Sequence, residues 1–202
     1  SNGTKQLYYE ELMGNKGFVG ISSILYHIHR PTEITDYRTI KELRWEKEEN
    51  DELRMRHLRS SLIPAGGSMV MDRVPLMFND DCAILFVRPT VQDEFFFRNG
   101  QADEMIYVSA GEGVVETIFG DLPYRRGDYV VIPRGILYRW RFEPNSKQDL
   151  LILESRGEIR TPKRYRNEHG QHMEGAPFCE RDFGVPRERA ARDEKGPFPI
   201  VV

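Results

Sequence analysis

Short apolar runs rich in valine, isoleucine, phenylalanine and tyrosine recur through the middle of the chain. They lie at residues 83–88, 94–98, 105–108, 113–119, 129–132, 138–142 and 150–154. Turn-forming asparagine, aspartate, glycine and proline separate them, as at residues 79–81, 99–100, 111–113, 120–121, 126–128 and 143–145. Strands spaced by roughly 8–12 residues with such turns predict an all-β sandwich or jelly roll. The order of the strands stays open at this point.

The segments on either side of this region are patterned differently. Residues 21–29 form a strand-like run in which alternation begins at Leu25, and Pro31 ends it. Residues 41–59 are crowded with charge, and their spacing fits either a solvated helix or a long exposed hairpin. From residue 161 onward the β pattern stops, until an apolar run begins at residues 198–202. We therefore expect an N-terminal extension at 1–62, a barrel at 63–160 and an irregular extension at 161–202.

Composition narrows the class of protein. The 202 residues carry a net charge of −3, and positive and negative side chains are interleaved. This argues against nucleic acid or an anionic membrane as the main partner. Cys82 and Cys179 are far apart and in no metal or redox spacing, which favours a reduced protein over a disulfide. With neither a spanning apolar run nor a signal-peptide pattern, we expect a cytoplasmic protein.

Residues 97–138 keep the spacing of the two metal-site motifs of cupin barrels but have lost the ligands. A metal-binding cupin has His-x-His before a glutamate and a glycine, and then Gly-x5-Pro-x-Gly-x2-His. Here Glu104 keeps the place of the glutamate, while Phe97 and Asn99 stand where the two histidines would be. Tyr138 replaces the final histidine. The spacing also retains the framework positions Gly111, Gly127, Pro133 and Gly135.

This replacement removes the ligand set of a transition metal. Such an ion needs two or three imidazoles and a carboxylate from neighbouring strands. Phenylalanine cannot coordinate, an asparagine amide is a weak ligand, and a tyrosine phenol stays protonated at neutral pH. We therefore expect no metal in this barrel. The candidate interior binding residues are Glu104, Tyr138, Phe97 and Asn99.

These interior residues allow a structural and a functional interpretation. Glu104 is either a buried carboxylate bonded to Tyr138 or a backbone donor, or a catalytic or binding group. The aromatic residues of this region either fill the core or line a ligand pocket; they are Phe95, Phe96, Phe97, Tyr138 and Trp140.

The histidines give no stronger metal signal. His27 and His29 share one strand face at a spacing that can bind metal, but the same pair is common on polar surfaces. We expect His169 and His172 to make interface or capping hydrogen bonds rather than to ligate. The sequence contains no nucleophile elbow, P-loop, dinucleotide fingerprint or zinc ribbon.

Long phrases of the chain resemble the N-terminal region of the bacterial-type homogentisate 1,2-dioxygenase family. The phrases are YYEELMGNKGF (8–18), SSILYHIHRPT (22–32), VPLMFNDD (74–81), DEFFFRNG (93–100), DEMIYVSAGEGVVET (103–117), LPYRRGDYVVIPRGILYRW (122–140) and PKRYRNEHGQ (162–171). The resemblance covers nearly the whole chain.

The resemblance implies a bicupin about twice this long that opens the ring of homogentisate with O2. The product is maleylacetoacetate, in tyrosine and phenylalanine breakdown. Fe(II) is held by two histidines and a glutamate in the C-terminal cupin, so no ligand or catalytic residue transfers to this chain. The N-terminal cupin is a metal-free scaffold that helps build a homo-oligomer. We therefore expect residues 161–202 to lead towards a catalytic cupin outside this sequence, and this segment alone to be inactive.

Two other hypotheses remain open from the sequence. One is a stand-alone, metal-free cupin that binds a small ligand or a partner. The other is a metal-independent enzyme, such as an isomerase, with Glu104 as its acid–base group and Tyr138 as a hydrogen-bond donor.

Overall fold

The computed structural model describes residues 7–14, 16–31, 33–49, 54–190 and 193–202. Two units are distinguished by their internal contacts. One contains Ser1–His57 with Ala190–Pro199, and the other contains Leu58–Arg189 with Ile200–Val202. The division into residues 1–62, 63–160 and 161–202 stays a prediction.

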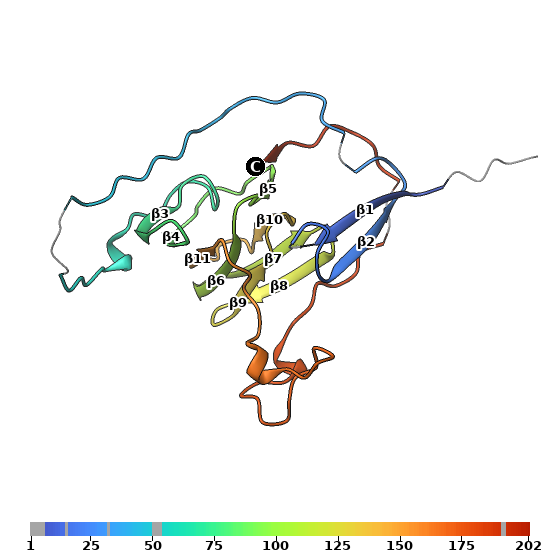
Figure 1. Ribbon diagram of the computed structural model, residues 1–202. Helices are drawn as coiled ribbons and strands as arrows, with labels where there is room; N and C mark the ends of the chain where they lie inside the picture. The colour runs from blue at the N-terminus through green and yellow to red at the C-terminus, as the bar shows by residue number, and fades with distance from the viewer. Residues whose placement is uncertain (1–6, 15, 32, 50–53, 191–192) are drawn as a thin grey trace, which may run out of the picture. The chain divides into compact units, whose positions relative to one another are not determined.

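The larger unit is a sandwich of two five-stranded sheets (Figure 1). One sheet has the order β3-β4-β11-β6-β9, with bounds Val74–Phe78, Cys82–Val87, Asp149–Ser155, Asp103–Ala110 and Tyr129–Ile132. The other has the order β12-β5-β10-β7-β8, with bounds Ile200–Val201, Phe96–Arg98, Leu137–Phe142, Glu112–Thr117 and Gly120–Arg125. Every pairing is antiparallel except that of β12 with β5. The chain crosses repeatedly between the sheets, which confirms the predicted all-β cupin jelly roll.

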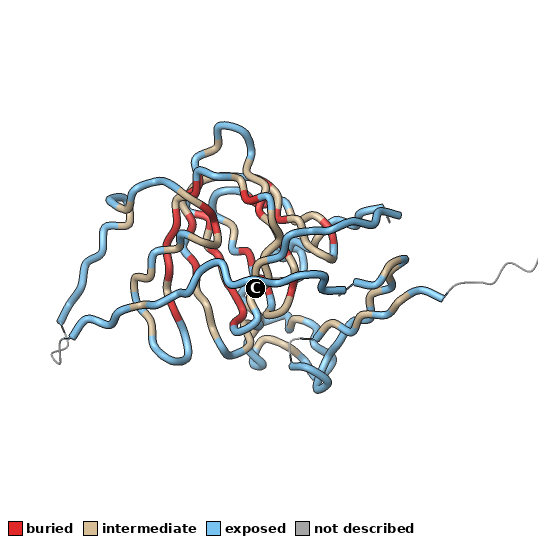
Figure 2. Tube along the Cα trace, turned by 90° about the horizontal axis from the view of Figure 1, so that it is seen from above, coloured by how far each residue is buried: buried red, intermediate tan, exposed pale blue. Residues whose placement is uncertain are grey.

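The core lies between the two sheets. Because side chains alternate along a strand, every second residue points inward. Leu85, Ile106 and Ile152 of one sheet and Val115 and Trp140 of the other are almost completely buried. Burial of each such apolar side chain contributes roughly 1.5–3 kcal/mol. Figure 2 shows the buried positions gathered on the strands of this unit.

The predicted strands of the barrel are confirmed with small shifts at their ends. The run at 129–132 matches β9 at both ends, whereas 94–98 shortens to the three residues of β5. Two strands, β3 and β8, were not predicted. Each contains a proline, Pro75 or Pro123, which argues against a central strand. Both are edge strands, where a missing backbone donor is tolerated.

Among its described residues, the smaller unit contains an antiparallel hairpin of β1 (Tyr9–Gly14) and β2 (Ser22–His27). The predicted run at 21–29 becomes β2, while β1 was not predicted. Residues 41–49 and 54–59 contain neither helix nor strand, so both structures expected for 41–59 are wrong there. Charge spacing alone does not create the apolar stripe that a helix buries. Residues 50–53 lie outside the described residues.

The remaining regular structure is short. The described part of the chain contains three 3-10 turns, η1 (Ser60–Leu62), η2 (Lys163–Tyr165) and η3 (Glu180–Asp182). The apolar run at 198–202 contributes β12. Within the described ranges, no helix has the length and hydropathy needed to cross a membrane.

Candidate functional site

The four residues selected from the sequence come together inside the barrel. Phe97 and Tyr138 are register partners on β5 and β10, and their rings meet edge to face with centroids 5.6 Å apart. Glu104 faces them from β6 in the other sheet and accepts a hydrogen bond from the Tyr138 hydroxyl. The Asn99 amide donates to the second Glu104 oxygen at 3.2 Å. The expected hydrogen bond between Glu104 and Tyr138 is therefore confirmed.

A fifth residue, Arg73, lies at the centre of this group and was missed by the sequence reasoning. Its Nη1 donates to Glu104 and, at 2.7 Å, to Glu154. Its Nη2 lies 3.1 Å from the Tyr138 hydroxyl oxygen. The guanidinium carbon is also 5.5 Å from the centroid of the Phe97 ring. The motif positions of a cupin metal site thus surround a guanidinium.

The loop before β3 fixes the position of Arg73. Its Nε donates to the Met69 carbonyl at 3.1 Å, within a turn closed by Asp72. The Asp72 carboxylate accepts from the Ser68 backbone at 2.8 Å. This close approach requires Gly67, because a Cβ there would lie 2.3 Å from Asp72 Oδ2 and the backbone φ is +70°. The turn and the Met69 carbonyl together therefore hold the Arg73 side chain in place.

The second acidic partner, Glu154, was also missed. It lies opposite Glu104 in the register of β11 and β6, and its side chain is 18% exposed. A signal for it exists in the sequence. Glu154 falls in the same alternation as Leu150 and Ile152, which point inward, so β11 places a carboxylate on the core side.

The buried charges determine the protonation states of Arg73 and Tyr138 and shift the pKa of Glu154. Burial lowers the Arg73 pKa, but attraction to the carboxylates of Glu104 and Glu154 more than offsets it and raises the pKa overall. Arg73 therefore stays a cation. Burial and the charge of Glu104 raise the pKa of Tyr138, so its phenol stays neutral and can donate. Burial also raises the pKa of Glu154, against the opposing effect of Arg73.

This arrangement does not fit an iron ion. A divalent cation would have to share the space with a guanidinium of the same sign, and that guanidinium already binds both carboxylates. Phe97 offers no ligand atom, and the Tyr138 phenol is protonated. Over the described part of the chain, no group of three or more His, Cys, Asp or Glu side chains is placed to hold a metal.

The barrel interior is filled. The cavity beside Phe97 and Tyr138 has a volume of about 10 Å³, room for about one water molecule. Tyr138 and Trp140 are 0% and 2% exposed, so these aromatic side chains fill the core rather than line a pocket. Phe96 points the other way, and Arg139 stacks on its ring at 4.3 Å.

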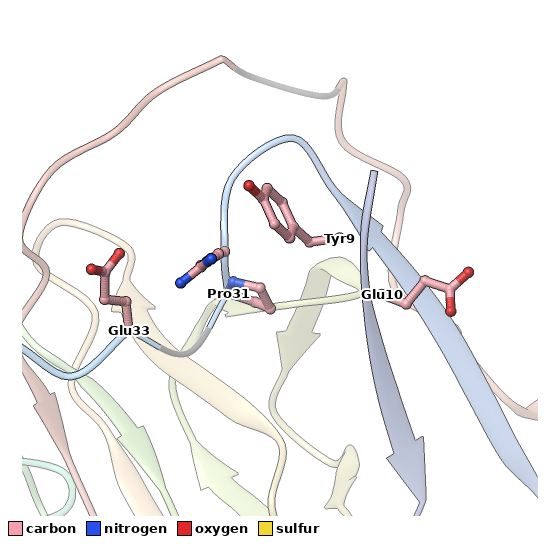
Figure 3. A pocket seen from close by; sticks show the side chains of 5 residues that line it. Tyr9, Glu10, Pro31 and Glu33 are labelled. Atoms are coloured by element: carbon pink, nitrogen blue, oxygen red, sulfur yellow. The ribbon is translucent and has the colours of Figure 1, made fainter. Parts of the chain in front are cut away.

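A larger hollow of about 340 Å³ lies in the smaller unit (Figure 3). Tyr9, Glu10, Arg30, Pro31 and Glu33 line it. Glu10 extends to the other side of β1 from Tyr9, as alternation along a strand requires (Figure 3). The charged groups are exposed and do not converge on one point, so this hollow lacks the features of a binding site.

The histidines make separate local contacts. His27 binds Glu11 at 2.9 Å, and His29 binds Asp193 at 2.7 Å. The two imidazoles therefore do not share a third ligand. The His172 backbone donates to Glu180, while its ring stacks on Phe183 with centroids 5.0 Å apart.

His169 behaves similarly in the neighbouring turn. Its backbone N–H donates to the Asn167 side chain at 2.9 Å, which closes the turn. These hydrogen bonds come from the backbone N–H groups of the two residues, so the expectation of interface or capping hydrogen bonds from His169 and His172 stays a prediction.

Comparison with known proteins identifies a relative that matches nearly the whole chain. No protein-family model matches the chain. A Saccharolobus solfataricus protein named "Putative dioxygenase" is 36% identical over 198 residues, which is 98% of this chain. The chain spans about half the length of this relative (50%).

Solved structures resemble the barrel more distantly. A cupin-2 domain protein from Shewanella frigidimarina has a TM-score of 0.36 at 19% identity, covering 42% of this chain and 80% of its own. A Thermus thermophilus protein has a TM-score of 0.41 at 17% identity, covering 50% and 97%. The assignment of the fold rests on the strand order described above, and similarity at this level carries no information on activity.

Proposed function

We propose that this chain is the metal-free scaffold half of a dioxygenase of the homogentisate 1,2-dioxygenase type. The full-length protein would open the ring of homogentisate, a small aromatic acid, with O2 to give maleylacetoacetate in tyrosine and phenylalanine breakdown. The Fe(II) for this reaction would lie outside the barrel described above. The proposal includes a cytoplasmic homo-oligomer. The dioxygenase name of the 36% identical relative supports the reaction class, and the sequence phrases support the substrate.

The observation that carries the scaffold role is the guanidinium of Arg73 among the motif positions of a cupin metal site. Arg73 and Glu104 are 6% and 0% exposed at their side chains. The charges of Arg73 and Glu104 neutralise each other inside the barrel, so its interior does not need a bound ligand. In this proposal the residues of the barrel hold a rigid framework, and no step of the oxygen chemistry takes place among them.

The alternatives from the sequence are disfavoured by the same geometry. A small ligand has no room beside a cavity of about 10 Å³. An acid–base role for Glu104 needs contact with a substrate, but both of its oxygens are engaged by Arg73, Tyr138 and Asn99. Its side chain is also inaccessible to solvent.

The test uses the full-length gene product, purified with its iron. We expect O2 uptake with homogentisate and one iron per chain. Glu104→Gln should keep both the iron content and the uptake if the variant remains folded, which circular dichroism would establish. Two irons per chain, or loss of iron in folded Glu104→Gln, would contradict the scaffold role. Absence of O2 uptake in the iron-loaded wild type would contradict the substrate.

A further inference from the structure

Residues 161–186, which we call the aromatic lobe, form an ordered segment without a core of its own (orange in Figure 1). None of these residues is buried. Four rings meet within the lobe with neighbouring centroids 5.0–5.6 Å apart, and they belong to Tyr165, His172, Phe178 and Phe183. An irregular segment of this length is uncommon in a compact domain. The order of the lobe therefore depends on how its two ends are attached to the barrel.

The beginning of the lobe is attached through Asp103 on β6. One oxygen of the Asp103 carboxylate accepts a hydrogen bond from the Ile159 N–H at 2.9 Å, and the other accepts from the Arg134 N–H at 2.9 Å. Hydrogen bonds to an ionised carboxylate are stronger than those between neutral groups. Because Asp103 is 1% exposed, salt screens this attachment only weakly.

The end of the lobe is attached through residues 187–189, which lie beside β8 and which we call the strap. Asp121 and Arg187 exchange two backbone hydrogen bonds of 3.0 and 2.7 Å. Gly120 allows this approach, because a Cβ there would lie 2.0 Å from the Arg187 carbonyl oxygen. The Arg189 guanidinium then donates to Glu116 at 2.9 Å and also to Asp121. A short backbone bridge and one arginine side chain therefore hold the strap.

The charged part of this second attachment is open to solvent. The side chains of Arg189 and Asp121 are 39% and 36% exposed, so salt screens their attraction. Glu116 also binds Arg139 at 2.7 Å, so its carboxylate keeps a cationic partner when Arg189 leaves. Departure of Arg189 therefore leaves no buried charge unpaired. The next strand along the chain that pairs with the barrel is β12, which begins at Ile200.

We propose that the strap is a releasable attachment that controls the order of the aromatic lobe. The lobe is ordered while Arg189 binds Glu116 and Asp121, and it loosens when salt screens these charges. The barrel stays folded in both states, because its strands pair with one another independently of Arg189. This inference goes beyond the proposed function and does not rest on it.

Hydrogen–deuterium exchange of the full-length protein tests the strap, because exchange follows the population of locally open states. The amides of Asn167 and Met173 report on the lobe, since they donate to the Gln171 and Tyr165 carbonyls. Raising sodium chloride from about 10 mM to about 1 M shortens the Debye length from about 30 Å to about 3 Å. Exchange of these amides should then become about fivefold faster, as expected for the loss of an exposed ion-pair network.

Arg189→Met should show the faster exchange already at low salt and no further increase at high salt. Arg126→Met is the matched control, because Arg126 is exposed and should be replaceable without effect on the lobe. The amide of Ile152 on β11 should exchange equally slowly in all these proteins. Lobe exchange that does not respond to salt in the wild type, or to Arg189→Met, would overturn the proposal. Faster exchange at Ile152 would also overturn it, because the barrel itself would then be opening.

A double-mutant cycle tests whether Arg189 and Asp121 act together. Asp121→Asn removes the charge but keeps the backbone that bonds to Arg187. Once Arg189 has been replaced by methionine, Asp121→Asn should not accelerate exchange of the lobe any further. Simple addition of the two effects would show that the residues act independently, and it would contradict the strap.

Discussion

Glu104 and Glu154 lie directly opposite each other on β6 and β11, and both carboxylates bind the same guanidinium nitrogen of Arg73. Like charges at opposed positions destabilise a sheet unless a cation lies between them. In a metal-binding cupin a metal ion would meet this need. In this barrel a side chain does so, and the stability of the centre depends on it.

Replacing the cation should therefore be costly. Arg73→Met removes the cation from between two carboxylates, and we expect a loss of about 3–5 kcal/mol in the free energy of unfolding. Urea titration followed by fluorescence would measure it. Arg126→Met is the control, because Arg126 is exposed and its loss should cost little. Equal effects of the two changes would contradict a central role for Arg73.

A free guanidinium ion from solution should restore the stability that Arg73→Ala loses. Arg73→Ala leaves a space lined by Glu104, Glu154 and the Tyr138 hydroxyl, which matches the shape and charge of a free guanidinium ion. Millimolar guanidinium chloride should raise the melting temperature of this variant, whereas sodium chloride at equal ionic strength should not. Arg126→Ala should show no such gain. Identical responses to both salts would indicate that the site does not recognise the cation.

The pH dependence of stability should reflect Glu154. Burial raises its pKa in the folded state above the ordinary 4.5, so the folded protein binds more protons than the unfolded chain above that pH. The contribution of Glu154 is then fully present below about 4.5 and is lost as pH rises through the folded pKa. Glu154→Gln should gain stability relative to wild type as pH rises from 4.5 towards neutrality. A constant difference across this range in urea titrations would refute the assignment.

The turn that presents Arg73 should depend on one glycine. Gly67→Ala introduces a Cβ that collides with Asp72 and forces a left-handed φ on alanine. We expect a loss of about 1–3 kcal/mol in the free energy of unfolding. Gly66→Ala is the neighbouring control, since its added Cβ meets nothing within 4 Å. Thermal unfolding of both variants, followed by circular dichroism, would measure the difference in stability. A Gly67→Ala protein as stable as wild type would show that the turn can relax around the added Cβ.

The local sequence pattern determines which strands and which site residues could be predicted. Alternation and turn residues define the strands of the barrel, and motif spacing brings Glu104 and Tyr138 together. Arg73 could not be found in this way, because it precedes Glu104 by 31 residues in a loop with no periodic pattern. The principle that a buried carboxylate needs a donor predicts that such a partner exists, but it does not identify the residue. The prolines in β3 and β8 hid two strands, because only the tertiary structure shows that these strands are edges.

The parallel pairing of β12 with β5 covers a strand edge that could otherwise promote aggregation. Val201 lies beside Phe97, so residues from the far end of the described chain cover the backbone donors and acceptors of β5. Uncovered, this edge would be a template for strands of neighbouring molecules. During synthesis the edge stays open until residues 200–201 have left the ribosome. Nascent chains shorter than this should therefore be the ones that depend most on chaperones.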